Sequence, residues 1–221
     1  MSSQSEIYEI INRCEIPQYS RILWDKLSNF VSETCVQRDS SHGFVHMQQV
    51  ACTSLYIQRQ DYPEMPVYLV NVLICCAWLH DVADHKYDSD GNLKKLVSQF
   101  LEEILPEYKN QILRVIKYSS YSMENKKNIT NWNQVFDDPT MLIIRNIMSD
   151  SDKLDTLGSN GIVRVIEYAQ YIGANIKEHL YHIGTTRILT LKDKYIRTNT
   201  GKRLAEIFHA EFENLFNLNF L

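Results

Sequence analysis

The sequence predicts an all-α protein, a single-domain helical bundle that spans residues 1–221. Apolar residues recur at the three- and four-residue spacing of amphipathic helices along most of the chain. No stretch alternates apolar and polar residues between hairpin turn signals, as β-strands do. Only 7 glycines and 5 prolines occur among the 221 residues, so few positions interrupt helical segments.

Each predicted helix has its own apolar stripe. The segments with helical spacing are residues 22–35, 45–57, 67–79, 93–105, 112–116, 141–157, 162–172 and 205–216. Residues 70–79 form an uninterrupted apolar run, which predicts a helix buried on all sides. Pro106 ends the fourth helix, and Gly158 ends the sixth. The sixth begins after Asp137, Asp138 and Pro139, an acidic cap followed by proline in the first turn.

Two polar segments predict breaks between helices. Residues 88–92, with the sequence DSDGN, have the composition of a turn. Residues 119–133 are polar and irregular, which favours a surface loop that could act as a lid. No segment is long and simple enough to be a linker between two domains.

Composition excludes several classes of function. The chain carries 23 basic and 27 acidic residues and a net charge of −4, so it has no basic field for duplex nucleic acid. Its longest apolar run is about ten residues, too short to span a membrane. The first residues lack the pattern of a signal peptide. We therefore expect an intracellular, cytoplasmic protein.

The cysteines point to the same compartment. Their number, five, is odd, and no Cys-x-x-Cys pair occurs. We interpret them as small buried hydrophobic residues in a reducing compartment.

The apolar run ends in His80-Asp81, an imidazole and a carboxylate at the end of a buried helix. A buried carboxylate needs a compensating partner. A divalent cation would serve, because both side chains are good metal ligands. A helix cap or a salt bridge would serve as well, and the dipeptide alone does not exclude them.

Other potential ligands lie on either side of this pair. His42 and His46 are four residues apart upstream and could share a helix face. Downstream, residues 148–158 contain Asp150, Asp152 and Asp155 near the end of another apolar helix. Side chains from separate helices can meet at one cation in a helical bundle.

The order His, His-Asp, Asp resembles the signature of the HD-domain metal-dependent phosphohydrolases. The segments DSSHGFVHMQQV, AWLHDVADHKYD and MSDSDKLDTLGSNGIVRVIEYA resemble a branch of small stand-alone HD hydrolases. The similarity covers about residues 25–175, and it leaves a helical C-terminal extension, about residues 180–221, without a counterpart. Gly43 departs from the pattern, because the family commonly has an aspartate there. Another residue, such as Asp39, would then support the site.

The resemblance implies metal ligands at His46, His80, Asp81 and one of two aspartates. Asp150 and Asp152 cannot both reach one ion, because two positions on a helix differ by roughly 200°. Hydrophobic spacing leaves both open. The family pattern places the ligand just before a basic residue and a leucine, which is Asp152 here. Asp150 would then support the site from behind or act as a capping group.

The resemblance implies one divalent ion, which could be Mn, Mg, Co, Fe, Ni or Zn. Binuclear HD enzymes have additional histidines between the His-Asp pair and the last aspartate, whereas only His85 lies in that interval here. A divalent ion of this kind makes a hydroxide nucleophile from its bound water at neutral pH. Asp84, beside the same helix end, is implied to act as general acid or base.

Further residues are candidates around the phosphate. Lys86 would assist catalysis and bind the substrate, and Lys153 and Arg164 are further phosphate-binding cations. His42 and His85 are candidates for groups behind the ligands, and His42 could also carry a proton.

The sequence thus predicts a phosphohydrolase that acts on a small phosphorylated metabolite, most simply a nucleotide. A nucleoside triphosphate pyrophosphohydrolase and a 5'-nucleotidase remain equally open. The alternative is a catalytically silent protein that binds metal or nucleotide, while di-iron oxygenase chemistry would need ligands that are missing. Helical spacing in the C-terminal stretch suggests packing or a homodimer surface.

Overall fold

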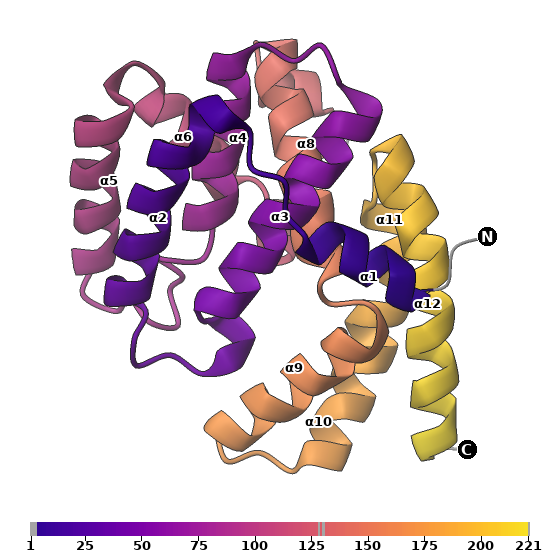
Figure 1. The fold of residues 1–221 in the computed structure, drawn as a ribbon. Coiled ribbons are helices and arrows are strands. Elements are labelled where there is room, and N and C mark those ends of the chain that lie inside the picture. Colours follow the sequence, from indigo (N-terminus) through magenta and orange to yellow (C-terminus); the bar gives the residue numbers. More distant parts are fainter. Residues whose placement is uncertain (1–3, 128, 130, 221) are drawn as a thin grey trace.

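The computed structural model describes residues 4–127, 129 and 131–220. Within these residues every regular element is helical and no strand occurs, which confirms the all-α prediction (Figure 1). The α-helices are α1 (Gln4–Asn12), α2 (Arg21–Thr34), α3 (Phe44–Asp61), α4 (Val67–Leu79), α5 (Asn92–Ile104), α6 (Lys109–Lys117), α7 (Tyr121–Lys127), α8 (Pro139–Leu154), α9 (Gly158–Tyr171), α10 (Ile176–Ile183), α11 (Leu189–Tyr195) and α12 (Asn199–Phe220).

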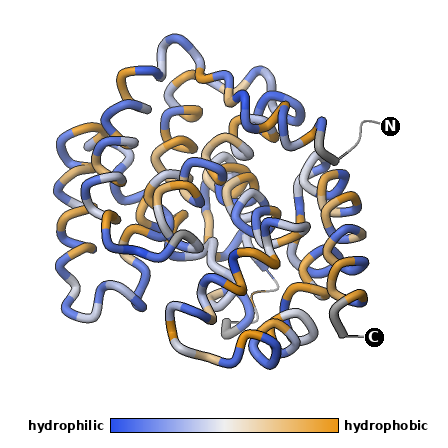
Figure 2. Tube along the Cα trace, turned by 60° about the horizontal axis from the view of Figure 1, so that its bottom comes forward, coloured by the Kyte–Doolittle hydropathy of each residue, from blue (hydrophilic) through white to orange (hydrophobic). Residues whose placement is uncertain are grey.

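Helix α4 lies at the centre of the bundle. Residues 69 and 70 and all of residues 72–79 are buried, as the apolar run predicts. It packs against α2, α3, α6 and α8. Trp78 meets Trp24 of α2 edge to face, with ring centroids 5.1 Å apart. The outer helices carry both hydrophobic and hydrophilic residues along their length (Figure 2). Because α4 is buried among these helices, its position, and therefore that of its C-terminal end, is fixed by the core.

The C-terminal helices pack on the same core. Helix α12 contacts α3, α8, α9 and α11, and α10 lies beside α9 (Figure 1). Asp61 at the end of α3 accepts hydrogen bonds from Thr200 N (2.9 Å) and Thr200 Oγ1 (2.6 Å). Gly184, between α10 and α11, lies against Phe216 so closely that a Cβ atom would be 2.3 Å from the ring. The helical C-terminal extension is therefore attached to the bundle by specific contacts.

Helix α8 begins as predicted. Asp138 accepts a hydrogen bond from Thr140 N (2.8 Å), and Pro139 occupies the first turn. The helix ends at Leu154, three residues earlier than the apolar pattern indicates, because Asp155 is already its C-cap. Gly158 then opens α9 at φ +72°, a conformation that favours glycine.

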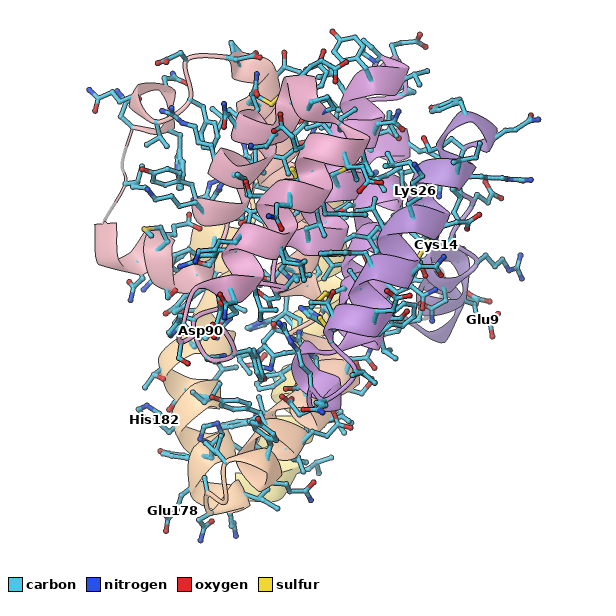
Figure 3. All side chains as sticks on the ribbon, turned by 90° about the vertical axis from the view of Figure 1, so that its left-hand side faces the viewer. Glu9, Cys14, Lys26, Asp90, Glu178 and His182 are labelled. Carbon is cyan, nitrogen blue, oxygen red and sulfur yellow. A yellow bond between two sulfur atoms is a disulfide. The ribbon has the colours of Figure 1, made fainter. Side chains whose placement is uncertain are left out.

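Two interpretations of the sequence were wrong in part. The predicted loop 119–133 contains α7 and a short 3₁₀ turn at Trp132–Gln134, although residues 128 and 130 lie outside the described residues. Cys14 and Cys52 are not separate thiols, because they form a disulfide between the end of α1 and α3 (Figure 3 labels Cys14). Cys35, Cys75 and Cys76 are free and buried, as expected.

The described helices include none with the length and apolar character needed to cross a membrane.

The contribution of Asp88 to the predicted turn at residues 88–92 can be tested by a measurement of stability. Its buried carboxylate accepts hydrogen bonds from Leu93 N (2.8 Å) and Lys94 N (3.1 Å) at the start of α5. We expect Asp88→Ala to lower the free energy of unfolding by about 1–2 kcal/mol, as the loss of a helix cap does. Urea denaturation would measure this. Asp137→Ala, at an exposed position outside the helices, is the control for a lost carboxylate, and an equal loss of stability there would contradict the capping role.

Candidate metal centre

Three helix ends bring four side chains to one point. His46 lies in the first turn of α3, His80 and Asp81 directly follow α4, and Asp152 lies in the last turn of α8. His46 Nε2 is 3.1 Å from His80 Nε2, 3.6 Å from Asp81 Oδ2 and 3.5 Å from Asp152 Oδ1. His80 Nε2 is 3.6 Å from Asp81 Oδ2 and 3.8 Å from Asp152 Oδ1. The structure thus brings together all four residues of the predicted set.

The donor set fits a divalent cation. Ligands at about 2.1 Å from an ion in cis or tetrahedral positions lie about 3–3.5 Å apart, close to the separations observed here. Ligand atoms of His46, His80 and Asp81 all lie within 4.8 Å of one another. The side chains of Asp81 and Asp152 remain 20% and 17% exposed, so the cluster is open to solvent on one side. Solvent can therefore reach a bound ion.

Charge also favours a cation at this point. Burial raises the pKa of Asp81, but the imidazoles of His80 and His46 outweigh it and hold that pKa well below its usual range. Burial raises the pKa of Asp152 too, and His80 lowers it to a net decrease. Both acids therefore stay ionised at neutral pH, so their negative charges attract a cation.

Asp155 fixes the orientation of His46. Its Oδ2 is 2.7 Å from His46 Nδ1, which leaves His46 Nε2 facing the cluster. Burial and the charge of Arg164 lower the pKa of His46, but hydrogen bonds with Asp155 and Asp81 raise it to a net increase. His80 is oriented in a similar way, because its Nδ1 donates to Ala77 O (2.8 Å). Such partners of metal-binding histidines set the tautomer.

Asp155 was noted in the sequence only as one of three nearby acids. Its role depends on a residue 109 positions away, and the spacing within α8 does not reveal that partner. The signal that could have found it is the three-residue separation from Asp152, which places both acids on adjacent parts of one helical turn.

Asp150 faces away from the cluster. Its carboxylate accepts hydrogen bonds from Arg197 N (3.0 Å), Thr198 N (2.7 Å) and Thr198 Oγ1 (2.7 Å), just before α12. Burial raises the pKa of Asp150, and the hydrogen bonds from Thr198 counteract that increase. Of the two roles predicted for Asp150, support behind the ligands is corrected, because its carboxylate instead caps the segment that leads into α12.

The turn after α4 is held by an arginine that sequence reasoning missed. Arg38 donates to Asp81 O (2.7 Å) and to Val82 O, and its guanidinium lies 4.4 Å from the centre of the Tyr87 ring. Carbonyl groups at a helix C-terminus lack partners within the helix. Arg38 therefore fixes the direction in which the His80-Asp81 pair leaves α4.

Asp84, His85 and Lys86 follow this turn at the surface. Asp84 Oδ1 accepts from Lys86 N (2.9 Å) and is 3.1 Å from His85 Nδ1. The His85 side chain is 80% exposed, so the geometry gives it no buried place behind the ligands. Lys86 Nζ lies 3.1 Å from His42 Nε2 and 4.8 Å from the centre of the Tyr168 ring.

Residues 39–42 form a rigid turn in front of α3. Asp39 accepts from Ser41 N (3.1 Å) and from the Tyr87 hydroxyl. Ser41 Oγ lies 2.6 Å from His42 Nδ1. Asp39 thus anchors the segment that carries His42.

The two further cations have different surroundings. Lys153 is fully buried, and its ammonium lies 3.3 Å from Glu124 Oε2 and bonds to Ser149. Burial lowers the pKa of Lys153 to about 8. The expectation that Lys153 binds phosphate is therefore corrected, because its charge is neutralised in the core. Arg164 contacts Asp155 Oδ2 (3.1 Å) and donates to Ser41 O (2.9 Å).

Two of the cavities beside the cluster contain side chains predicted to act on the substrate. The larger, about 600 Å³, is lined by His80, Asp81 and Asp84 together with apolar side chains of α4, α5, α6 and α7. The smaller, about 260 Å³, is lined by His42, Lys86 and Arg164 and by residues of α9, α10 and the turn after α10. The large cavity has the size of a small-molecule site.

Solved structures of similar fold cover nearly the whole chain. A crystal structure of an HD-superfamily hydrolase from Bacillus thuringiensis is 24% identical, with a TM-score of 0.63, over 90% of this chain and 95% of that chain. The chain has the HD-type fold. A crystal structure from Lactobacillus plantarum is 17% identical, with a TM-score of 0.71, over 92% of this chain and 96% of that chain.

A further solved structure of similar fold contains a nucleotide. Bacillus subtilis YpgQ in complex with ADP is 19% identical, with a TM-score of 0.63, over 88% of this chain and 92% of that chain. Sequence comparison also finds YpgQ, described as uncharacterized, at 23% identity over 197 residues, 84% of this chain and 86% of the relative. No protein-family model matches the chain.

Variants of Asp150, Asp152 and Asp155 distinguish effects on metal binding from effects on stability. We expect Asp152→Asn to lower the affinity for Mn²⁺ at least about 100-fold, and Asp155→Asn to lower it about 10–100-fold by releasing His46. Asp150→Asn should leave Mn²⁺ affinity within about threefold and instead destabilise the protein, because it weakens acceptors for Arg197 N and Thr198. Calorimetric titration and urea denaturation measure the two effects. Loss of Mn²⁺ binding in Asp150→Asn at unchanged stability would reverse the assignment.

His42 provides a pH test. Burial, followed by the charge of Lys86, lowers its pKa from 6.5 to about 4. Because the unfolded chain binds this proton more readily, His42 contributes stability above pH 6.5 that is lost as the pH falls toward 4. NMR of the histidine ring should show titration near 4. In Lys86→Met the pKa should rise part of the way toward 6.5, and an ordinary value in the parent protein would contradict this environment.

Proposed function

We propose that the protein is a metal-dependent phosphohydrolase that acts on a nucleotide. The observation that carries the proposal is the convergence of His46, His80, Asp81 and Asp152 beside a cavity of about 600 Å³. The HD-type fold and the ADP complex of YpgQ support a nucleotide-related role.

His46, His80, Asp81 and Asp152 would hold one divalent ion, with Asp155 orienting His46. A divalent cation supplies Lewis acidity, which activates water and neutralises charge on a phosphoryl oxygen. The exposed position of His85, the one histidine between Asp81 and Asp152, supports a single ion. The ligand types suit Mn, Mg, Co, Fe, Ni or Zn.

Asp84 is the proposed general acid or base. It lines the large cavity together with His80 and Asp81, and its carboxylate is held by Lys86 N. A carboxylate fixed in this way can take a proton from an attacking water or donate one to a leaving oxygen. Lys86, whose ammonium lines the neighbouring small cavity, would neutralise a phosphate oxygen.

Arg164 has a double part in this proposal. Its guanidinium contacts Asp155, so it can stabilise the carboxylate that orients His46. Arg164 also lines the small cavity, where it can bind a phosphate. The large cavity would take the nucleoside, since Val97, Leu113, Ile116 and Met123 give it an apolar wall. Both a triphosphate cut that releases diphosphate and a monophosphate cut are compatible with this arrangement.

The experiment is a substrate screen with metal. The purified chain, supplied with Mn²⁺, Mg²⁺, Co²⁺ or Fe²⁺, should hydrolyse at least one nucleoside mono-, di- or triphosphate. Asp81→Ala should lose metal and activity, and Asp84→Asn should keep metal while kcat falls about 10²–10⁴-fold, as loss of a general acid or base does.

Two results would count against the proposal. Turnover that is unchanged in Asp81→Ala would show that the activity does not use this centre. Bound metal and tight nucleotide binding without turnover of any substrate would favour a catalytically silent binding protein instead. Asp90→Asn, at an exposed turn, is the control for a lost carboxylate.

A further inference from the structure

Arg187 lies in an unusual helical turn of the C-terminal extension. Residues Gly184–Ile188 form a π-helical turn between α10 and α11. Such turns are rare and are frequent at functional sites, because the inserted residue displaces side chains from their α-helical positions. Close contact between Gly184 and Phe216 of α12 holds the turn in place. The turn lies outside the segments that resemble HD hydrolases.

The guanidinium of Arg187 lacks an acceptor in the part of the chain that the structure describes. Its Nε is buried and makes no hydrogen bond, and its guanidinium carbon Cζ lies 4.7 Å from the centre of the Tyr121 ring. Arg145 and Arg197, by contrast, both pair with Glu124. Burial of a charged group without a partner is costly. Arg187 therefore has a buried Nε–H donor that the described residues leave unsatisfied.

Arg187 shares the small cavity with other positive groups. Lys86 and Arg164 line the same cavity of about 260 Å³, together with His42 and His179. Among the described lining residues none is acidic. Burial lowers the pKa of Arg187, whereas the charge of Asp152 raises it, so the guanidinium also interacts with the acids of the metal centre. The cavity is thus a positive pocket next to the metal centre.

The shape of the pocket restricts what it can hold. Its volume is below the range of about 300–1,000 Å³ for sites that enclose a drug-sized ligand. A phosphate or diphosphate group is smaller and carries several negative charges. Two of its oxygens can accept parallel hydrogen bonds from one guanidinium.

We propose that Arg187 binds a phosphate of the substrate other than the one attacked at the metal centre. This inference rests on the proposed function for the identity of the substrate. The inference gives the C-terminal extension a part in the site, because the π-helical turn presents a guanidinium to the small cavity. Lys86 and Arg164, which come earlier in the sequence, line the same cavity. The ligand chemistry is that of a phosphate or diphosphate group.

The first experiment measures binding of inorganic diphosphate by calorimetry to the full chain supplied with Mg²⁺. Arg187→Ala should weaken binding about 10–100-fold, as expected for loss of hydrogen bonds between charged groups. Arg187→Met keeps most of the volume against Tyr121 and should lose as much affinity. Arg21→Ala removes the same charge from the exposed surface of α2 and should bind as the parent does.

A second experiment observes the arginine side chains of the parent protein directly and uses a conservative variant only to assign the signal. In the parent protein, NMR signals of arginine Nε–H groups should include one that shifts on addition of diphosphate, and Arg187→Lys identifies it. Unchanged diphosphate affinity in Arg187→Ala, or no arginine signal that shifts, would overturn the inference.

The outcomes also separate the two proposals. Lost diphosphate affinity in Arg187→Ala without turnover of any nucleotide would retain the anion site and remove the enzyme. Turnover that depends on Asp81, together with diphosphate binding that does not depend on Arg187, would retain the enzyme and remove this inference.

Discussion

The structure depends on holding two ionised carboxylates beside two imidazoles at the meeting point of three helices. Asp81 and Asp152 repel each other, and burial further disfavours their charges. The imidazoles of His46 and His80 compensate part of this cost, at separations of 3.5–3.8 Å from the acids. Each helix must therefore be fixed by forces that do not come from the cluster itself.

Those forces come from apolar burial and from caps behind the cluster. Helix α4 is buried almost along its whole length, so the core determines where His80 emerges. Arg38 satisfies the carbonyl groups at that end, and Asp155 sets the His46 ring. This division is common in metal sites, where the second layer of contacts positions ligands that would otherwise separate.

Much of this arrangement could be predicted from the sequence. The apolar stripes indicated most of the long helices, and the His80-Asp81 pair at the end of a buried run indicated a site. Two supporting contacts could not be predicted in this way: His46 with Asp155, and Arg38 with the end of α4. Each joins residues that are far apart in the sequence, and the residues around them show no pattern that indicates the contact. Lys153 illustrates the opposite error, since a lysine beside a ligand was expected to face phosphate, whereas the helix turns it toward Glu124. Helices α1, α7, α10 and α11 are short, with seven to nine residues each, and short helices depend on tertiary contacts more than on periodicity.

Helix α8 joins two parts of the molecule through neighbouring residues. Asp152 points into the cluster, and Asp150, two positions earlier, receives three donors from the segment that leads into α12. A chain shortened before residue 197 would leave a fully buried acid without those donors, one half-turn from a proposed ligand. The segment that begins at Arg197 is thus a structural requirement for the helix that carries the final aspartate, and any circular permutation or fusion at this end must preserve that attachment.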